Sequence, residues 1–256
     1  KDTSTITSNV QAPVLAASVG DKSTAVAVGL STARNNIDSD VDASIRSSSG
    51  SDKNSVSVTN GSVLVEAEQA STIESTAAAS AIGISAGASS SKAFSGGGAI
   101  ANNTIAGSTK ASLERSDITE SDSVSLSAKD AATINATVES AAVAVAVGSG
   151  TTPAIAIGIS VATNEIGNDD DSRNPVEVKA YTKDSNIETA GTLSVTATAN
   201  NSIAATVKAT AIAVGASSAS SVGASGAGGI TNNQIITDVA ALIDTAEQIK
   251  TGGALS

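Results

Sequence analysis

The sequence predicts an all-β protein, specifically a repetitive β-solenoid of the right-handed parallel β-helix type. Apolar and polar residues alternate strictly over many short stretches, as in half-buried strands and unlike disordered chains. The apolar 40% of the chain is nearly all Ala, Val and Ile, with one Phe, one Tyr and no Trp or Met. Such short side chains suit a thin interior, which repetitive β architectures provide. Similar units also recur along all 256 residues.

Two anchors define the repeat. An Asn-x-Ile motif recurs in steps of 68, 61 and 69 residues, with its Asn at Asn35, Asn103, Asn164 and Asn233. An upstream Thr/Ser-Ile pair recurs in steps of 67, 61 and 69 residues, with its Ile at Ile6, Ile73, Ile134 and Ile203. A fixed period is the signature of a repeat architecture. We therefore predict one continuous segment of four repeats, cut from a longer chain, with bounds 1–61, 62–122, 123–191 and 192–256.

Each repeat contains the same elements in the same order. An alternating strand comes first, at 62–67, 123–128 and 193–197. An alanine-rich double strand with a Gly/Ser turn follows, at 14–37, 77–105, 141–166 and 209–235. A third alternating strand is expected at 41–45, 110–113, 176–181 and 239–243, and a short strand and turn close the unit, as at 185–191. Residues 238–250 also fit an amphipathic helix, but their counterparts have period two, so we predict a strand there.

The unit of about 64 residues divides into three coils of roughly 21 residues, a usual size for a parallel β-helix. About twelve coils at ~4.8 Å spacing would make a rod roughly 60 Å long. In this arrangement Val and Ile point inward, and the alternating alanines face outward. An alternative is a mixed solenoid in which the alanine-rich double strand forms one antiparallel hairpin per repeat.

Composition excludes several functions. The net charge of −11 and the absence of a basic cluster argue against nucleic acid as a partner. Without His or Cys, the Ser-His-Asp and Cys-His catalytic systems and the zinc sites that use those ligands are excluded. We therefore predict that the chain is not an enzyme and has no catalytic residues or organic cofactor.

Acidic residues provide the one candidate for a metal site. Glu165, Asp169, Asp170 and Asp171 lie in an acidic loop, and Ca²⁺ prefers several oxygen ligands. A solvated acidic corner explains the same residues. Asp38, Asp40 and Asp42 alternate and share one strand face, which keeps that face charged. The four repeat asparagines are expected to bond to their own turns, because one Asn per three coils cannot form an unbroken ladder.

The repeats resemble those of giant secreted bacterial surface proteins, namely haemagglutinin-like adhesins and large autotransporter passengers. The resemblance is carried best by residues 160–166, 178–181, 185–197 and 203–229, whereas repeats one and two depart from it. It implies an extracellular, cell-surface stalk or adhesive segment that binds other cells or surface glycans and proteins. The alternative function is a calcium-dependent β-helix that binds or cleaves polysaccharide.

The uncharged stretch 141–164 resembles a membrane span in length, but its internal turn and period of two indicate two strands instead. We therefore predict no membrane insertion. Because both faces of these strands lack charge, we expect a second layer of the same unit or a neighbouring molecule to cover the alanine-rich face. Lateral self-association through that face is the corresponding prediction for a partner.

Overall fold

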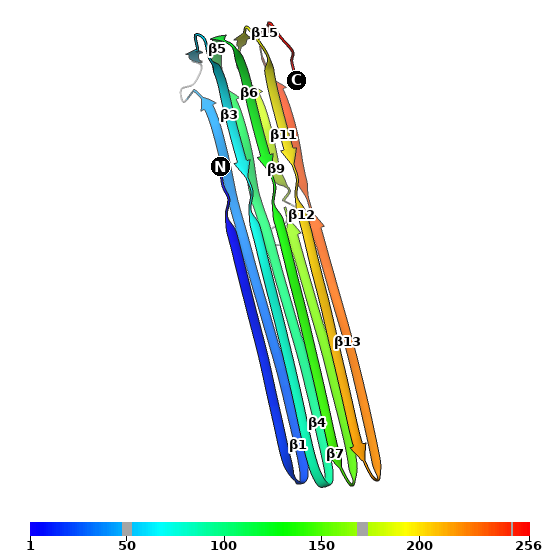
Figure 1. Ribbon diagram of the computed structural model, residues 1–256. Coiled ribbons are helices and arrows are strands. Elements are labelled where there is room, and N and C mark those ends of the chain that lie inside the picture. The colour runs from blue at the N-terminus through cyan, green and yellow to red at the C-terminus, as the bar shows by residue number, and fades with distance from the viewer. Residues whose placement is uncertain (48–52, 168–173, 247) are drawn as a thin grey trace.

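The protein is all-β. The computed structural model describes residues 1–47, 53–167, 174–246 and 248–256, and this part of the chain contains strands and no helix. Figure 1 shows a long arm made of paired strands, joined to a shorter base that holds both chain termini. The strands of the base and the arm run along the same long direction, so successive repeats lie side by side.

The strands follow one order in every repeat. The first two repeats contain β1 (Thr5–Arg46), β2 (Asn54–Ser57), β3 (Ser62–Gln69), β4 (Thr72–Glu114) and β5 (Ser116–Ser121). The third contains β6 (Ser123–Asp130), β7 (Thr133–Gly148), β8 (Thr151–Ile166), β9 (Val176–Lys183) and β10 (Ile187–Thr189). The fourth contains β11 (Leu193–Ala199), β12 (Ser202–Ser217), β13 (Ser220–Ile235), β14 (Thr237–Asp244) and β15 (Ile249–Thr251). In β1 and β4 the outgoing and returning strands of the arm are continuous with the strand that follows.

Every strand pair among the described residues is parallel and joins one repeat to the next. The outgoing strands pair in the order β1–β4–β7–β12, and the returning strands pair as β1–β4–β8–β13. Both sequence anchors lie in register, since Ile73 pairs with Ile6 and Ile134, and Asn103 pairs with Asn35 and Asn164.

The register corrects the predicted number of coils. Three coils per repeat would pair residues about 21 positions apart, whereas the paired residues are one whole repeat apart. One repeat therefore makes one wide turn, and four turns at ~4.8 Å spacing place the first and last only about 14 Å apart. The length lies along the strands instead, because a 16-residue strand such as β7 spans roughly 50 Å.

The two strands of the arm are not a hydrogen-bonded hairpin. Among the described strands, β7 pairs with β4 and β12, and β8 pairs with β4 and β13, but β7 and β8 do not pair with each other. They lie in opposite layers and pack face to face. The mixed solenoid with an antiparallel hairpin is therefore not the arrangement found.

Alanine fills the interior of the arm. Ala142, Ala144 and Ala146 of β7 are 0% exposed and form one cluster with Ala154 and Ala156 of β8. The expected second layer of the same unit thus covers the alanine-rich face. The direction of the larger side chains was predicted wrongly, because the interleaved Val and Ile residues point outward.

Glycines show how closely the two layers approach. A Cβ atom on Gly97 would lie 2.6 Å from the carbonyl oxygen of Ala141 in the opposite layer. A Cβ on Gly158 would lie 2.7 Å from the carbonyl oxygen of Thr210. Branched side chains therefore have little room between the layers, and the inward phase of the arm strands carries mostly Ala, Gly or Ser, with Val14, Val138 and Thr152 among the exceptions.

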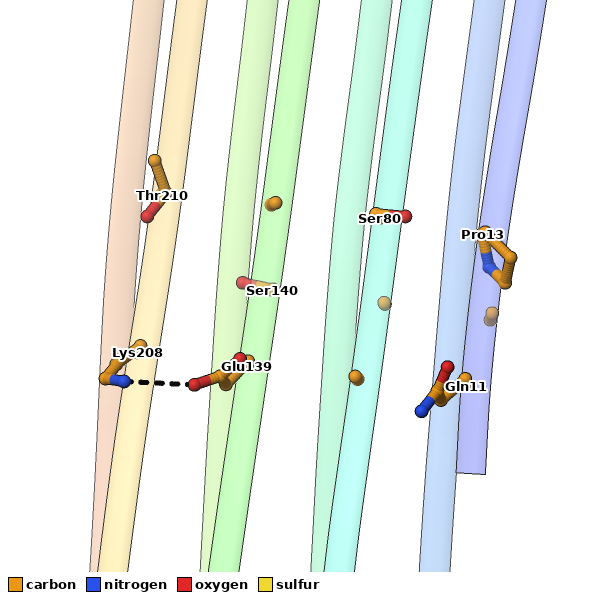
Figure 2. Close-up of a pocket in the computed structure, with 11 residues that line it drawn as sticks. Gln11, Pro13, Ser80, Glu139, Ser140, Lys208 and Thr210 are labelled. Carbon is orange, nitrogen blue, oxygen red and sulfur yellow. Dashed lines mark hydrogen bonds and ion pairs between the residues drawn. The ribbon is translucent and has the colours of Figure 1, made fainter. Parts of the chain in front are cut away.

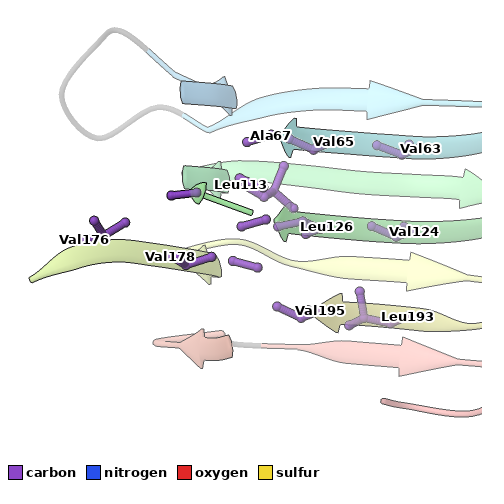
Figure 3. Close-up of a cluster of buried hydrophobic side chains, with 14 of the residues drawn as sticks. Val63, Val65, Ala67, Leu113, Val124, Leu126, Val176, Val178, Leu193 and Val195 are labelled. Carbon is purple, nitrogen blue, oxygen red and sulfur yellow. The ribbon is translucent and has the colours of Figure 1, made fainter. Parts of the chain in front are cut away.

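The base holds a wider core of larger residues. Figure 3 shows Val63, Val65, Leu126 and Leu193 of the β3–β6–β11 sheet packing toward Val178 and its neighbours on the opposite wall. Ile73, Ile105, Ile134 and Ile166 continue this core to the point where the arm begins. Residues 237–244 form β14 in register with β9, so the strand expected there is confirmed and the helix is not formed.

We expect Gly97→Ala to lower the midpoint of thermal unfolding, with a cost of about 1–3 kcal/mol, because the added methyl group collides with backbone of the opposite layer. Gly96→Ala is the matched control, since a Cβ at Gly96 meets nothing within 4 Å. Circular dichroism melting curves measure both. Equal melting temperatures for the two variants would contradict the close packing of the layers.

Candidate functional site

The outer faces of the arm are the largest candidate for a functional surface. On the outgoing strands, large exposed aliphatic side chains line one face: Leu15, Val19, Ile82, Ile84, Val147, Ile212 and Val214. On the returning strands they line the other: Val26, Val28, Leu30, Ile100, Ile155, Ile157, Ile159 and Ile230. Ile157 and Ile159 are each 51% exposed and Leu30 is 73% exposed. We call these two surfaces the apolar arm faces.

The apolar arm faces carry almost no charge. Residues 10–20, 75–91, 140–164 and 209–237 contain no Asp, Glu, Lys or Arg, although the whole chain has a net charge of −11. Monomeric proteins rarely expose a continuous apolar patch larger than a few hundred Å². Surfaces of this kind mark contact sites with other molecules.

Sequence reasoning missed these faces because it assigned the two phases of the alternation to the wrong sides. One signal would have identified them. Gly83, Gly97 and Gly158 share the phase of the alanines, and a phase made up mainly of Gly, Ala and Ser indicates an interior that is narrow for Val or Ile.

A groove crosses the outgoing strands between the apolar face and the charged base. Its volume is about 270 Å³, and Figure 2 shows Pro13, Ser80 and Thr210 lining it from three different repeats. These residues and Ala141 form one row across the sheet. Lys208 Nζ lies 3.1 Å from Glu139 Oε1 at one end. The groove exists because the side chains in this row are small, and the ion pair places charges at the edge of the groove.

The repeat asparagines form an unbroken hydrogen-bonded ladder from one repeat to the next, and Asn35, Asn103 and Asn164 are buried. Asn35 Nδ2 donates to Asn103 Oδ1 at 2.7 Å, Asn103 Nδ2 to Asn164 Oδ1 at 2.7 Å, and Asn164 Nδ2 to Asn233 Oδ1 at 2.8 Å. Asn103 and Asn164 are fully buried. The expectation that each Asn bonds to its own turn is therefore wrong. It followed from the wrong coil count, because one turn per repeat places an Asn in every turn.

The ladder is expected to stabilise the stack, because a buried amide without a partner costs about 1–3 kcal/mol. Asn103→Ala should lower the unfolding free energy by about that amount, since it removes the partner of Asn164 Oδ1. Asn102→Ala is the control, as Asn102 is the adjacent, exposed residue. Chemical denaturation compares the two. A cost for Asn102→Ala as large as that for Asn103→Ala would refute the role of the ladder.

Ion pairs connect repeats on the outer surface of the base. Glu177 accepts from Lys110 of the preceding repeat at 2.8 Å and from Lys179 at 2.8 Å, and Lys179 lies 3.1 Å from Asp238 of the next repeat. Hydrogen bonds from these two lysines lower the pKa of Glu177 to about 2. The pairs are partly exposed, so each contributes little to stability, at most about 1 kcal/mol.

The structure describes only one of the four calcium candidates. Glu165 is half-buried on the returning strand, in register with Thr104 and Gln234. Asp169, Asp170 and Asp171 lie outside the described residues. Within the described ranges, no group of three or more acidic residues could hold a metal ion. The calcium site stays a prediction.

The three alternating aspartates lie where the sequence placed them. Asp38, Asp40 and Asp42 are all exposed on one face of β1. Asp40 Oδ1 accepts a hydrogen bond from Ser108 at 2.6 Å, and Asp42 Oδ2 lies 2.8 Å from Arg46 Nη2. Asp40 thus contacts the next repeat and Asp42 contacts its own strand, and all three carboxylates stay exposed. This arrangement agrees with a charged face that is turned to solvent.

Asp130 is a buried acid where β6 ends. It is 1% exposed, and its carboxylate oxygens make no well-formed hydrogen bond, although the Asn201 side chain and the Ala131 backbone amide lie close enough to offset part of the effect of burial. Burial raises the pKa of Asp130 above its ordinary value, because the charged form loses its hydration. The raised pKa means that ionised Asp130 costs stability at neutral pH, and that this cost disappears as the pH falls below the pKa of the unfolded chain.

Asp130→Asn should therefore raise the unfolding free energy at pH 7, by about 1–3 kcal/mol. The gain should shrink as the pH is lowered toward 3.8, the ordinary pKa of Asp, because Asp130 of the unchanged protein is then protonated in the folded state. Melting curves over a pH series measure this difference. Asp122→Asn removes an exposed carboxylate and is the control. A gain that is constant with pH would show that the charge is not its cause.

No protein-family model, curated protein or solved structure matches this chain. Within the described ranges, no helix is long and apolar enough to cross a bilayer. The candidate surface is therefore identified from its own geometry alone.

Proposed function

We propose that this chain is a segment of a right-handed parallel β-solenoid with a structural and adhesive role in a large bacterial cell-surface or secreted protein. The apolar arm faces are the observation that carries the proposal. They present uncharged aliphatic side chains on both sides of a thin arm, in all four repeats. In this function the base supports the arm, and the arm contacts other cells or their surface proteins and glycans.

The stacking of repeats supports the structural part of this role. Each turn pairs in parallel with the next over the full arm, so every added repeat contributes similar backbone and side-chain contacts. A right-handed path is the usual one for parallel strands that are joined by crossovers in one sheet. Repeats built this way extend a protein without any change in design, which suits a long stalk.

The arm supports the adhesive part. Burying an Ile or Val side chain in a contact stabilises it by about 1.5–3 kcal/mol. Several such side chains lie at every second position of β8, and the turn residues Ser149 and Gly150 lie at the tip of the arm. The apolar arm faces are thus suited to contacts with apolar surfaces, and the groove beside Lys208 and Glu139 adds a polar contact at their border.

We expect the triple variant I155T/I157T/I159T to reduce attachment of protein-coated beads to cells by at least about tenfold, because it removes three apolar contacts. Leu64→Thr is the control, since Leu64 is an exposed aliphatic residue of the base. Equal attachment of the triple variant and the unchanged protein would contradict adhesion through this face.

The same assay separates adhesion from the calcium-dependent alternative. Adhesion through aliphatic side chains should persist when calcium is removed by a chelator. Loss of attachment in chelator, reproduced by Asp169→Asn and Asp171→Asn, would favour the carbohydrate-binding function instead.

A further inference from the structure

The apolar arm face on the returning strands alternates large and small residues across the sheet, from one repeat to the next. Two neighbouring outward rows, which we call the glycine rows, are Val28, Gly96, Ile157, Gly226 and Leu30, Gly98, Ile159, Gly228. Large aliphatic residues occupy repeats one and three, and glycines occupy repeats two and four. The face is therefore corrugated, with aliphatic ridges on β1 and β8 that lie about 9.6 Å apart.

Most of the glycine positions leave open space between the ridges. A Cβ atom added at Gly96, Gly226 or Gly228 would have nothing within 4 Å beyond its own neighbours in sequence. Gly98 differs, because Leu30 Cδ2 lies 2.7 Å from the position of its Cβ. Three of the four glycines thus leave a hollow that no other side chain of the described chain fills.

These outward glycines have no explanation within the chain. Glycine weakens a strand, and it often marks a place where another backbone or a ligand approaches closely. The inward Gly97 and Gly158 fit this rule, because carbonyl oxygens of the opposite layer lie 2.6 and 2.7 Å from their Cβ positions. No such backbone lies over Gly96 or Gly226. A surface from outside the chain would account for them.

The glycine rows are complementary to themselves. A second copy turned about a two-fold axis that runs along the strands, between β4 and β8, presents its strands in reverse order. Its β8 then faces β4, and its β13 faces β1. In the first row Ile157 of one copy lies over Gly96 of the other. Val28 lies over Gly226, and the second row repeats this pattern. A patch that meets itself in this way forms the isologous contact of a two-fold dimer.

Charge does not oppose this contact. The patch around the glycine rows lies within residues 24–34, 92–102, 153–163 and 222–232. Its only charged residues are Lys92 and Arg34, at opposite ends of the patch. The two-fold placement sets Lys92 against Pro153 and Arg34 against Asn232, so no like charges meet.

The patch is also large enough for a stable dimer. It spans about 33 Å along the strands and about 19 Å across them, so each copy would bury roughly 630 Å². The sum of about 1,260 Å² falls in the range of specific, stable interfaces. Two sheets that pack face to face keep their strands within about 30° of each other. The glycine rows lie at the centre of the patch, where this rotation displaces residues least.

From these observations we infer that this returning face binds the same face of a second copy of the chain, with the aliphatic ridges of each copy over the glycines of the other. The inference rests on the proposed function, since it names the partner of one of the two surfaces assigned to contacts. Because β4 and β8 lie inside the stack and use their outer sides, further turns at either end would leave this contact intact.

Light scattering over a range of protein concentrations tests the dimer. The molar mass of the unchanged protein should rise toward twice the monomer mass of 24.6 kDa. Gly96→Val should raise the dissociation constant at least about tenfold, because the added side chain meets Ile157 twice in each dimer. Gly20→Val is the matched control, since a Cβ at Gly20 also meets nothing within 4 Å and lies outside the patch. Melting curves check that both variants fold.

A swap variant tests the complementarity itself. Ile157→Gly alone should weaken the dimer, because two glycines then face each other. The double variant G96V/I157G moves the ridge from β8 to β4 and the hollow from β4 to β8. A large residue again faces a glycine, so the dissociation constant should return to within a few-fold of the unchanged value.

Attachment of coated beads to cells separates this inference from the proposed function. Gly96→Val keeps every aliphatic side chain, so attachment should persist while dimers are lost. A monomeric unchanged protein, an unaltered dissociation constant for Gly96→Val, or a double variant as weak as the single ones would each overturn the inference. Those three outcomes leave adhesion standing. Dimers that show the expected variant effects but no attachment to cells support the inference and contradict the adhesive function.

Discussion

The close approach of the two layers in the arm is the constraint on which the rest of the structure depends. A backbone carbonyl oxygen of the opposite layer lies only 2.6 Å from the Cβ position of Gly97 and 2.7 Å from that of Gly158, so the interior of the arm is filled mainly by Ala, Gly and Ser. The Val and Ile residues that alternate with these small residues therefore point outward. The apolar arm faces are therefore a direct result of the thin interior. Their aliphatic content needs no separate explanation in terms of folding, and it is available for contacts with other molecules.

In-register stacking is the second determinant, and it links the arm to the base. The asparagine ladder runs where the interior changes from the alanines of the arm, such as Ala101, to the isoleucines of the base, such as Ile105. Its hydrogen bonds fix the rows of neighbouring turns, since a one-residue slip would leave buried amides without partners. The ladder also has a direction, because each Nδ2 donates to the Asn of the following repeat.

Particular elements show how far sequence reasoning reached. The strand at 237–244, the turn in 141–166 and the register of both anchors agree with the structure. The coil count was wrong because a repeat length does not reveal whether strands within it stack or face each other. The wrong coil count led to a second error, namely the prediction that Asn103 and Asn164 do not hydrogen-bond to each other. For Val145 and Ala146 the alternation was recognised, but period two gives two faces without saying which one is inside.

The sequence alone determined that this protein is built of β-strands and that its structural unit repeats every 61 to 69 residues. Both conclusions follow from composition and periodicity, which can be read from the sequence directly. It also determined the lack of charge on the arm. Only the tertiary structure decided that one repeat makes one turn, that Ala144 faces inward and Ile157 outward, and that Asn35 and Asn233 end a single ladder. These features depend on the distance between the two layers of the arm. That distance follows from how small side chains of both layers pack across the interior, so the sequence of a single strand does not determine it.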